Sequence, residues 1–394
     1  MKDMKIESSS DTRAKRHLGL VLSTSLATLA CLPVFANDHS ARRHRDEDET
    51  RYRQINLVSD LPRVAQVQDT NLVNGWGISF HPTFPFWISD NATGKTTLYS
   101  VTNDASGSPH AETVPLVVSI PGAGSATGQV INNDPSAFNG DIFLFVSEDG
   151  TISGWRPDLG TAAEVLTSRP TAVYKGVTLA TVGTNTVLLA ANFSEGTLDL
   201  YDGYSNLVGQ FTDTMAPAGY APFNVQNLNG TVYVTFARQD AARQDDVSGC
   251  GRGLIDIFDV NAGTFYRFAA GSRAGGHISA MNSPWGLAIA PSSFGSHANE
   301  LLVGNFGSGT IMTFDSFGNF RGLLEGTSDC PLTIDGLWGL TFGAGGASGV
   351  ATDLYFSAGP NAESHGLFGV IQAQNDSNGD DNDSGCGGHH GHCH

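Results

Sequence analysis

Short runs of alternating apolar and polar residues, separated by Gly-rich turns, recur along most of the chain. One clear example runs from Trp285 to Ala290, continues from Leu301 to Asn305, and ends with Thr310 to Asp315. Alternation with a period of two in runs of five or six residues predicts consecutive antiparallel strands. A sheet of three or four such strands cannot bury both of its faces alone, so it needs neighbours of the same kind.

Six copies of this pattern can be aligned. Their second runs end about 43 to 68 residues apart, at Asp90, Asp149, Asn192, Ala237, Asn305 and Ala358. Repeats of roughly 40–50 residues, with insertions, are typical of propeller blades. We therefore predict an all-β fold, a six-bladed β-propeller over residues 54–372. Two packed β-sandwiches are the alternative, but they leave the recurrent Trp-Gly pairs at Trp76, Trp285 and Trp338 unexplained.

The start of the predicted domain can close the ring. A propeller closes most easily when its last sheet takes a strand from the beginning of the chain, because this removes a free sheet edge. Ile55 to Val58 form the first apolar run of the domain. We expect this run to supply that strand.

Both ends of the chain differ from the repeats. In residues 1–36, basic Lys15 and Arg16 precede an apolar run, Leu18 to Leu32, that is short for a membrane span, and Ala36 follows as a small residue at the expected cut. This pattern predicts a signal peptide, with a signal anchor as the alternative. We expect a secreted or periplasmic protein without a membrane span after the signal is removed. Residues 37–53 are predicted to be a disordered polar leader, and residues 373–394 a disordered acidic and Cys/His-rich tail.

The composition narrows the choice of partners. The formal net charge is −18, and only 15% of residues are charged. Nucleic acids and anionic membranes require a basic surface, so neither is an expected partner. We expect a monomer that binds a small molecule or a protein whose identity the sequence does not specify.

Four cysteines remain once Cys31, within the predicted signal, is set aside: Cys250, Cys330, Cys386 and Cys393. An even number of cysteines in an exported chain permits disulfides, and three pairings are possible. We favour Cys250 with Cys330, and Cys386 with Cys393, because the second pair closes a very short loop. Four separate thiols are the alternative.

Several segments carry a resemblance to known proteins. They are Asn74 to Ile78, Phe143 to Trp155, Cys250 to Gly253, Leu302 to Gly307 and Ser357 to Phe368. Together they resemble an uncharacterised family of exported bacterial β-propeller proteins over about residues 54–372. This family has no established activity to transfer to the chain.

The blades are also remotely similar to NHL-repeat and gluconolactonase-like six-bladed propellers. In the lactonase group, Asn, Asp and Glu residues hold a divalent metal at the mouth of the central channel. The matching positions here are Asn74, Asn224 and Asp335, and the remaining blades offer Gln129, Lys175 and Ser283. The resemblance thus implies a Ca²⁺ or Zn²⁺ site at the channel mouth and, as an alternative function, a metal-dependent hydrolase of the lactonase type. The other interpretation is that these side chains cap turns ahead of the inner strands.

A second set of polar residues stands where strands meet hairpin turns: Asp90, Asn91, Glu148, Asp149, Asn192, Asn305, Glu363 and His365. Turn formation accounts for most of them. Glu363 and His365 form an acid–base pair if His365 faces the channel. The sequence contains no Gly-x-Ser-x-Gly, phosphate-loop or His-Glu-x-x-His motif, so the catalytic residues, if any, are unknown. For Trp76, Trp285 and Trp338, packing is favoured over a ligand platform.

The tail is rich in soft metal ligands. Two thiols and four imidazoles fall within nine residues: Cys386, His389, His390, His392, Cys393 and His394. Such ligands suit Zn²⁺, Ni²⁺ or copper, although the spacing matches no structural zinc module. The sequence therefore favours a binding or scaffold module, with a channel-mouth hydrolase and metal capture by the tail as alternatives.

Overall fold

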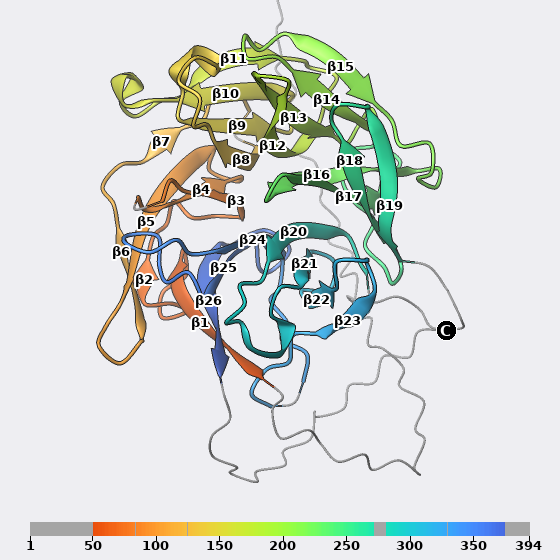
Figure 1. Cartoon of the computed structure of the whole chain (residues 1–394). Coiled ribbons are helices and arrows are strands. Elements are labelled where there is room, and N and C mark those ends of the chain that lie inside the picture. Colours follow the sequence, from red (N-terminus) through yellow and green to blue (C-terminus); the bar gives the residue numbers. More distant parts are fainter. Residues whose placement is uncertain (1–49, 83, 124, 272–280, 329, 375–394) are drawn as a thin grey trace, which may run out of the picture.

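Six sheets surround a common axis in the computed structural model, and their strands are antiparallel except for the β1–β2 pair (Figure 1). The structure describes residues 50–374, except for 83, 124, 272–280 and 329. Each sheet is one blade, and the blades follow one another around the ring in chain order. The predicted six-bladed β-propeller is thus confirmed.

Each blade has an innermost strand that lines the axis and an outermost strand at the rim. Blade 1 contains β3 (Gly75–Ser79), β4 (Phe86–Asp90), β5 (Lys95–Asn103) and β6 (Pro109–Thr113), with β7 (Val118–Ser119) paired to β5. Blade 2 contains β8 (Ala126–Ile131), β9 (Phe143–Ser147), β10 (Thr151–Trp155) and β11 (Glu164–Ser168). Blade 3 contains β12 (Tyr174–Val182), β13 (Asn185–Asn192), β14 (Thr197–Tyr201) and β15 (Leu207–Phe211).

The second half of the ring repeats this order. Blade 4 contains β16 (Tyr220–Leu228), β17 (Thr231–Arg238), β18 (Gly253–Asp259) and β19 (Thr264–Ala270). Blade 5 contains β20 (Pro284–Ile289), β21 (Leu301–Asn305), β22 (Ile311–Phe314) and β23 (Phe320–Leu323). Blade 6 contains β24 (Leu337–Phe342), β25 (Leu354–Ala358), β26 (Leu367–Gln374), β1 (Arg51–Ser59) and β2 (Val67–Gln68).

Blade 6 joins the two ends of the domain. Strand β1 pairs antiparallel with β26, from Arg51 opposite Gln374 to Ser59 opposite Leu367. The expected closing strand is confirmed, but it is longer than predicted. It begins at Arg51, inside the segment expected to be a disordered leader, and β26 ends at Gln374, inside the expected tail. The backbone pairing of these residues and the burial of the Tyr52 side chain explain the extension.

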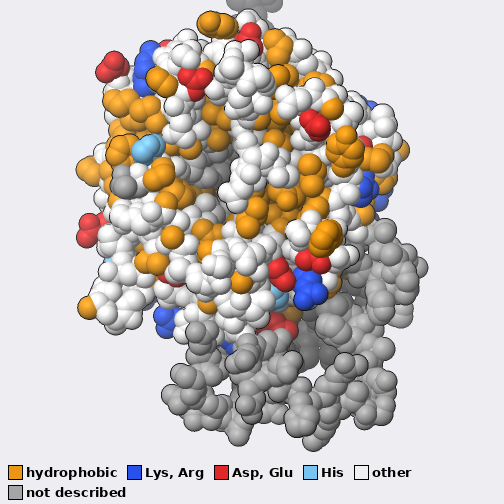
Figure 2. Space-filling model, viewed as in Figure 1, with side chains coloured by type: hydrophobic (Ala, Val, Ile, Leu, Met, Phe, Trp, Pro, Cys, Tyr) orange, Lys and Arg blue, Asp and Glu red, His pale blue; other side chains and the backbone are white. Residues whose placement is uncertain are grey.

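Apolar side chains fill the space between neighbouring blades. Between blades 5 and 6, for example, Ala288 and Leu302 pack in one cluster with Phe356 and Ile371. Charged side chains are sparse on the face shown in Figure 2, and hydrophobic and uncharged groups cover much of it. The short 3-10 turns η1 (Phe138–Gly140), η2 (Pro157–Leu159) and η3 (Gly295–His297) lie in loops. No helix among the described residues is long and apolar enough to cross a membrane.

A β-bulge near the start of every inner strand brings the six strands close together. The residues at this constriction are Gly77, Gly128, Gly176, Asn224, Gly286 and Gly339. A Cβ atom on Gly77 would lie 2.7 Å from the Thr127 carbonyl oxygen, and one on Gly286 would lie 2.4 Å from that of Trp338. Such close backbone approach explains the recurring glycine, and it fixes the position of the residue before it.

Candidate functional site

Aromatic side chains close the channel at the constriction. The residues that precede the six close positions are Trp76, Thr127, Lys175, Phe223, Trp285 and Trp338. The rings of Trp76 and Trp338 stack with centroids 3.7 Å apart, and Trp285 meets both rings edge-on. We call Trp76, Phe223, Trp285 and Trp338 the aromatic plug. All four are buried, so the packing interpretation of the tryptophans holds.

Lys175 takes the place that a tryptophan occupies in three other blades. Its Nζ atom lies 5.1 Å from the centre of the Trp76 ring, and its side chain is 2% exposed. The ammonium group donates hydrogen bonds to Glu148 Oε1 and, at 3.3 Å, to Asp245 Oδ1. Burial alone would lower the pKa of Lys175, but these two carboxylates outweigh burial and the pKa is raised. Lys175 is therefore a buried cation held by its partners.

Hydrogen bonds extend from Lys175 around the channel mouth. Asn91 Nδ2 donates to Glu148 Oε2 at 3.1 Å. Asn74 Nδ2 donates to Asn91 Oδ1 at 3.3 Å and to Glu363 Oε1 at 3.0 Å. Side chains of blades 6, 1, 2 and 3 are thus connected in one chain of contacts.

An insertion between β17 and β18 contributes the remaining acidic groups. It places Asp245 beside Lys175, and Asp246 accepts hydrogen bonds from Ser283 Oγ and, at 3.0 Å, from Ser248 Oγ. All six blades therefore contribute to one polar assembly at the channel mouth. We call this assembly the mouth ring; its members are Asn74, Asn91, Glu148, Lys175, Asp245, Asp246, Ser283 and Glu363.

The mouth ring has an excess of negative charge. It combines four carboxyl groups with one lysine, which gives a formal charge of 1 − 4 = −3 if all are ionised. Burial raises the pKa of Glu363, although the hydrogen bond from Asn74 and the charge of Lys175 oppose the shift. Burial also raises the pKa of Asp246. Both groups retain a proton to higher pH than a free carboxyl group does.

Unusual backbone geometry places Glu363 at the ring. Asn361, Ala362 and Glu363 have φ angles of 56°, 51° and 63°, so three consecutive residues other than glycine are left-handed. Asn74 and Ser283, at matching points of blades 1 and 5, also have positive φ angles of 53° and 49°. Left-handed residues of this kind are uncommon and are enriched at functional sites.

The four residues predicted for the channel mouth lie in different environments. Asn74 belongs to the mouth ring, whereas Gln129 and Asn224 line the channel cavity on the other side of the constriction. Asp335 is exposed at the rim, where its Oδ2 atom accepts a hydrogen bond of 2.7 Å from the Asn361 backbone. The structure therefore does not bring the four together as one metal shell. Within the described part of the chain, no three His, Cys, Asp or Glu side chains are placed to share an ion.

The second predicted set divides in a similar way. Asn91, Glu148 and Glu363 join the mouth ring, but His365 does not pair with Glu363. Its Nδ1 atom instead lies 2.8 Å from Asp60 Oδ2, at the end of β1. Asp149 accepts hydrogen bonds from the backbone of Ala123 and Thr151, as a turn residue does.

Sequence reasoning named Lys175 and Ser283 only as the residues that their blades offer at the channel mouth, and it missed Asp245 and Asp246. Alignment of the residue before each constriction glycine would have singled out Lys175, because a lysine there replaces a buried tryptophan. No local signal marks Asp245 and Asp246, which lie in an insertion without a repeat counterpart. Their role depends on contacts that form only in the closed ring.

Cys250 and Cys330 are both disulfide-bonded. The expected pairing of one with the other stays a prediction. The remaining disulfide candidates, Cys386 and Cys393, lie outside the described residues. The same holds for the other predicted tail ligands, His389, His390, His392 and His394.

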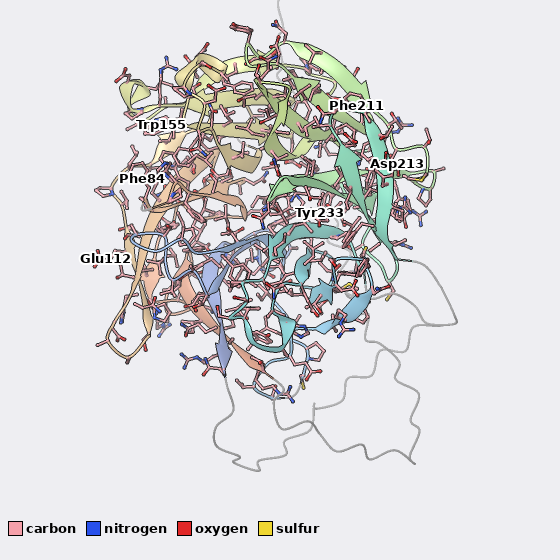
Figure 3. All side chains as sticks on the ribbon, in the orientation of Figure 1. Phe84, Glu112, Trp155, Phe211, Asp213 and Tyr233 are labelled. Atoms are coloured by element: carbon pink, nitrogen blue, oxygen red, sulfur yellow. The ribbon has the colours of Figure 1, made fainter. Side chains whose placement is uncertain are left out.

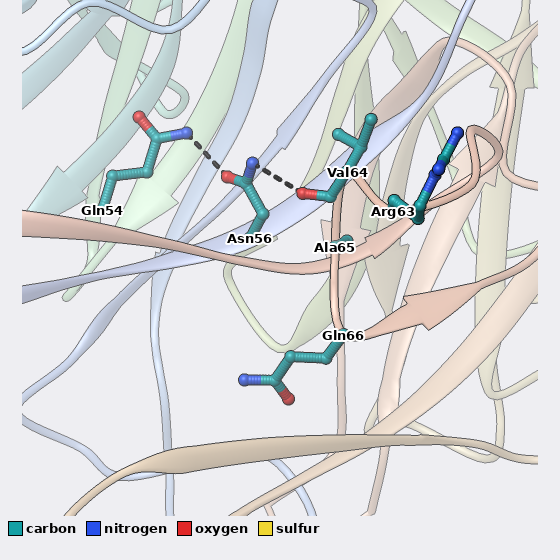
Figure 4. Close-up of a pocket in the computed structure, with 6 residues that line it drawn as sticks. All are labelled: Gln54, Asn56, Arg63, Val64, Ala65 and Gln66. Atoms are coloured by element: carbon teal, nitrogen blue, oxygen red, sulfur yellow. Dashed lines mark hydrogen bonds between the residues drawn. The ribbon is translucent and has the colours of Figure 1, made fainter.

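Two features away from the mouth ring have structural explanations. A wide, shallow depression beside β1 is lined by Gln54, Asn56 and residues 63–66 (Figure 4). Its amides are satisfied locally, since Gln54 Nε2 donates to Asn56 Oδ1 at 2.8 Å and Asn56 Nδ2 to the Val64 carbonyl at 3.1 Å. Asp213, labelled in Figure 3, is ion-paired to Arg267 at 3.3 Å, in the outer part of the disc. Neither feature gathers unpaired chemical groups.

Comparison with known proteins places the chain among viral relatives. The sequence matches no protein-family model. It is 31% identical over 299 residues to the uncharacterized protein R648 of Acanthamoeba polyphaga mimivirus, a match that covers 72% of each chain. It is 28% identical over 337 residues to the uncharacterized protein L690 of the same virus, covering 80% of this chain and 84% of the relative.

Solved structures with a similar outline have little sequence in common with the chain. Virginiamycin B lyase from Staphylococcus aureus is 11% identical with a TM-score of 0.44, and the match covers 82% of this chain and 99% of the lyase. Regucalcin, a calcium-binding protein from Agrobacterium tumefaciens, is 13% identical with a TM-score of 0.43, covering 77% and 92%. Because the relatives found by sequence are viral, the expected bacterial affiliation stays a prediction. By its identity and coverage, the chain belongs to the family of the mimivirus protein R648.

Proposed function

We propose that the protein is a binding module and that its mouth ring takes a small ligand carrying positively charged amino groups. One observation supports this most directly. Side chains from six blades meet in a single polar assembly, in which Glu148, Asp245, Asp246 and Glu363 outnumber the one cation, Lys175. A cationic ligand would supply the positive charge that this arrangement lacks.

Differences in exposure define how such a ligand would be held. The Asp245 side chain is 69% exposed and that of Glu148 is 17% exposed, whereas the Lys175 side chain is 2% exposed. Asp245 and Glu148 are thus reachable from solvent, while the Lys175 side chain lies beneath them. The rings of the aromatic plug are buried, so they offer no stacking surface to a ligand at the mouth ring. Charge and hydrogen bonds, rather than stacking, would therefore determine recognition.

The net charge of the whole chain supports the same ligand class. At −18, the protein attracts cations and repels anions at a distance. We also propose that binding occurs outside the cytoplasm, in a secreted or periplasmic protein, because residues 1–36 have the pattern of an export signal.

Calorimetric titration of the full chain at low salt tests this proposal. The ligands to be titrated are 1,5-diaminopentane, its neutral analogue 1,5-pentanediol, and Ca²⁺. We expect the diamine to bind and the diol not to bind. Glu363→Gln keeps an acceptor for Asn74 but removes the charge, and we expect it to weaken diamine binding about tenfold. Asp245→Asn removes an exposed charge and should weaken binding about two- to fivefold.

Asp335→Asn is the matched control, because Asp335 is a carboxylate on the same rim but outside the mouth ring. Equal binding of diamine and diol, or equal effects of the ring variants and this control, would refute the proposal. Retention of Ca²⁺ that is lost in Asp335→Asn would instead support the metal-dependent hydrolase of the lactonase type.

A further inference from the structure

The channel forms a second, separate cavity on the far side of the aromatic plug. It has a volume of about 220 Å³ and is lined by residues of all six inner strands. Trp285 of the plug is part of its wall. Val130, Ile131 and Thr341, further along the inner strands, also line it and are partly exposed. The cavity is therefore closed towards the mouth ring and opens towards the opposite face of the disc.

Two residues that line this cavity carry buried polar atoms without partners. The amide orientation of Gln129 is fixed, because its Nε2 atom donates to the Gly77 carbonyl at 2.8 Å and to the Trp87 carbonyl. Its Oε1 atom is buried without a hydrogen bond, and the residue is only 7% exposed. Ser79 Oγ is a second buried atom without a partner. An acceptor left unpaired in a buried site is costly, so a bound group that donates to it is favoured.

The remaining lining limits what that group can be. The residues that line the cavity include no Asp, Glu, Lys, Arg or His. A charged ligand would lose its hydration there without gaining a counter-charge. Trp285 supplies an apolar surface, and Ser79, Thr178 and Thr341 are among the uncharged polar residues of the lining. The lining residues Ile78, Val225 and Leu340 pack into the cores between blades. Since a cavity of about 150 Å³ can hold benzene, this one has room for a single substituted ring.

We propose that the channel cavity is a binding site for a neutral molecule of about one ring that carries a hydroxyl or N–H group. The donor group faces Gln129 Oε1, and the ring packs beside Trp285. The site differs from the mouth ring in location and in the charge of its ligand. It does not depend on the function proposed for the mouth ring.

Ligand-observed NMR on the full chain, with millimolar benzyl alcohol, toluene and benzylammonium, tests this assignment. Benzyl alcohol has the donor, toluene lacks it, and benzylammonium carries a charge. We expect benzyl alcohol to bind at least fivefold more tightly than toluene. Thr341→Trp, at the open end of the cavity, should abolish binding of both. Gln129→Met should weaken benzyl alcohol at least fivefold and leave toluene unchanged.

Further variants separate the two sites. Asp245→Asn, in the mouth ring, should leave benzyl alcohol binding unchanged while it weakens any binding of benzylammonium. If Gln129→Met does not fold, because Gln129 also bridges blades 1 and 2, Thr341→Trp still decides the question. The proposal is overturned if none of the probes binds, which would mean that water alone fills the cavity. It is equally overturned if benzyl alcohol binds no better than toluene or if Thr341→Trp leaves its binding intact.

Discussion

The indole of Trp338 donates a hydrogen bond of 3.0 Å from Nε1 to Asn74 Oδ1. This contact joins the aromatic plug to the mouth ring, because the amide nitrogen of the same Asn74 donates to Glu363 and Asn91. Asn74 and its bond with Trp338 are buried, whereas its bonds with Asn91 and Glu363 are partly buried. A change in the packing of the plug will therefore affect the position of the acidic groups above it.

Asn74→Gly should destabilise the protein by about 2 kcal/mol, because Trp338 and Glu363 lose a buried partner. Asn74→Ala should cost about 1 kcal/mol more, since Asn74 has a φ of 53° and alanine tolerates that conformation less well than glycine. Urea unfolding of the two variants and the parent protein measures both the loss of the hydrogen bonds and the added backbone cost of alanine. Equal stability of Gly and Ala at this position would contradict the backbone part of the argument.

Lys175→Met should lower the free energy of unfolding by about 3 kcal/mol, because it leaves Glu148 partly buried without its cation. Glu148→Gln in the same chain should restore part of the loss, since the unpaired charge is then removed as well. Chemical denaturation of the single and double variants forms the test. A double variant less stable than Lys175→Met alone would show that the unpaired charge of Glu148 is not the cause of the destabilisation.

Glu363 should make stability depend on pH. Its pKa in the folded protein is raised, chiefly by burial, above the ordinary value of 4.5. The folded state then binds more protons than the unfolded state, so this contribution to stability is present below pH 4.5 and is lost as pH rises through the folded pKa. Glu363→Gln should therefore become more stable relative to the parent protein as pH increases over that window.

Thermal unfolding across pH 4 to 8 measures this difference. Glu112→Gln provides the control, because Glu112 is exposed on β6 (Figure 3). The same pH-dependent difference in both variants would exclude Glu363 as its source.

Gly286→Ala should destabilise the constriction by about 2–3 kcal/mol, because the added Cβ would lie 2.4 Å from the Trp338 carbonyl oxygen. Gly322→Ala, on the outer strand β23, is the matched control. The nearest atom to its added Cβ is His297 Cε1, 3.7 Å away, so its effect should stay within about 0.5 kcal/mol. Comparable melting temperatures for the two variants would argue against a sterically defined constriction.

The local pattern of apolar residues, glycines and tryptophans was sufficient to predict the six-bladed fold. It was not sufficient to predict which residues form the mouth ring. The Trp-Gly pairs recur because each inner strand meets its neighbours at one close point, so a repeated local feature reported the repeated geometry. The closing strand was also predictable, since an unpaired sheet edge requires a partner. In contrast, a shift of one or two positions determines where a polar side chain points. Asn224 thus replaces a constriction glycine, and Asp335 lies two residues before β24, at the exposed rim.

The pairing of β1 with β26 also constrains how the molecule is made. Among the described strands, β1 is synthesised first and its partner β26 last. During translation, the edge of β1 that pairs with β26 therefore stays unpaired. The ring can close only after more than 300 further residues have been synthesised. Ring closure therefore requires Leu367 to Gln374, and a nascent chain interrupted before Leu367 would present an edge able to capture strands from its neighbours.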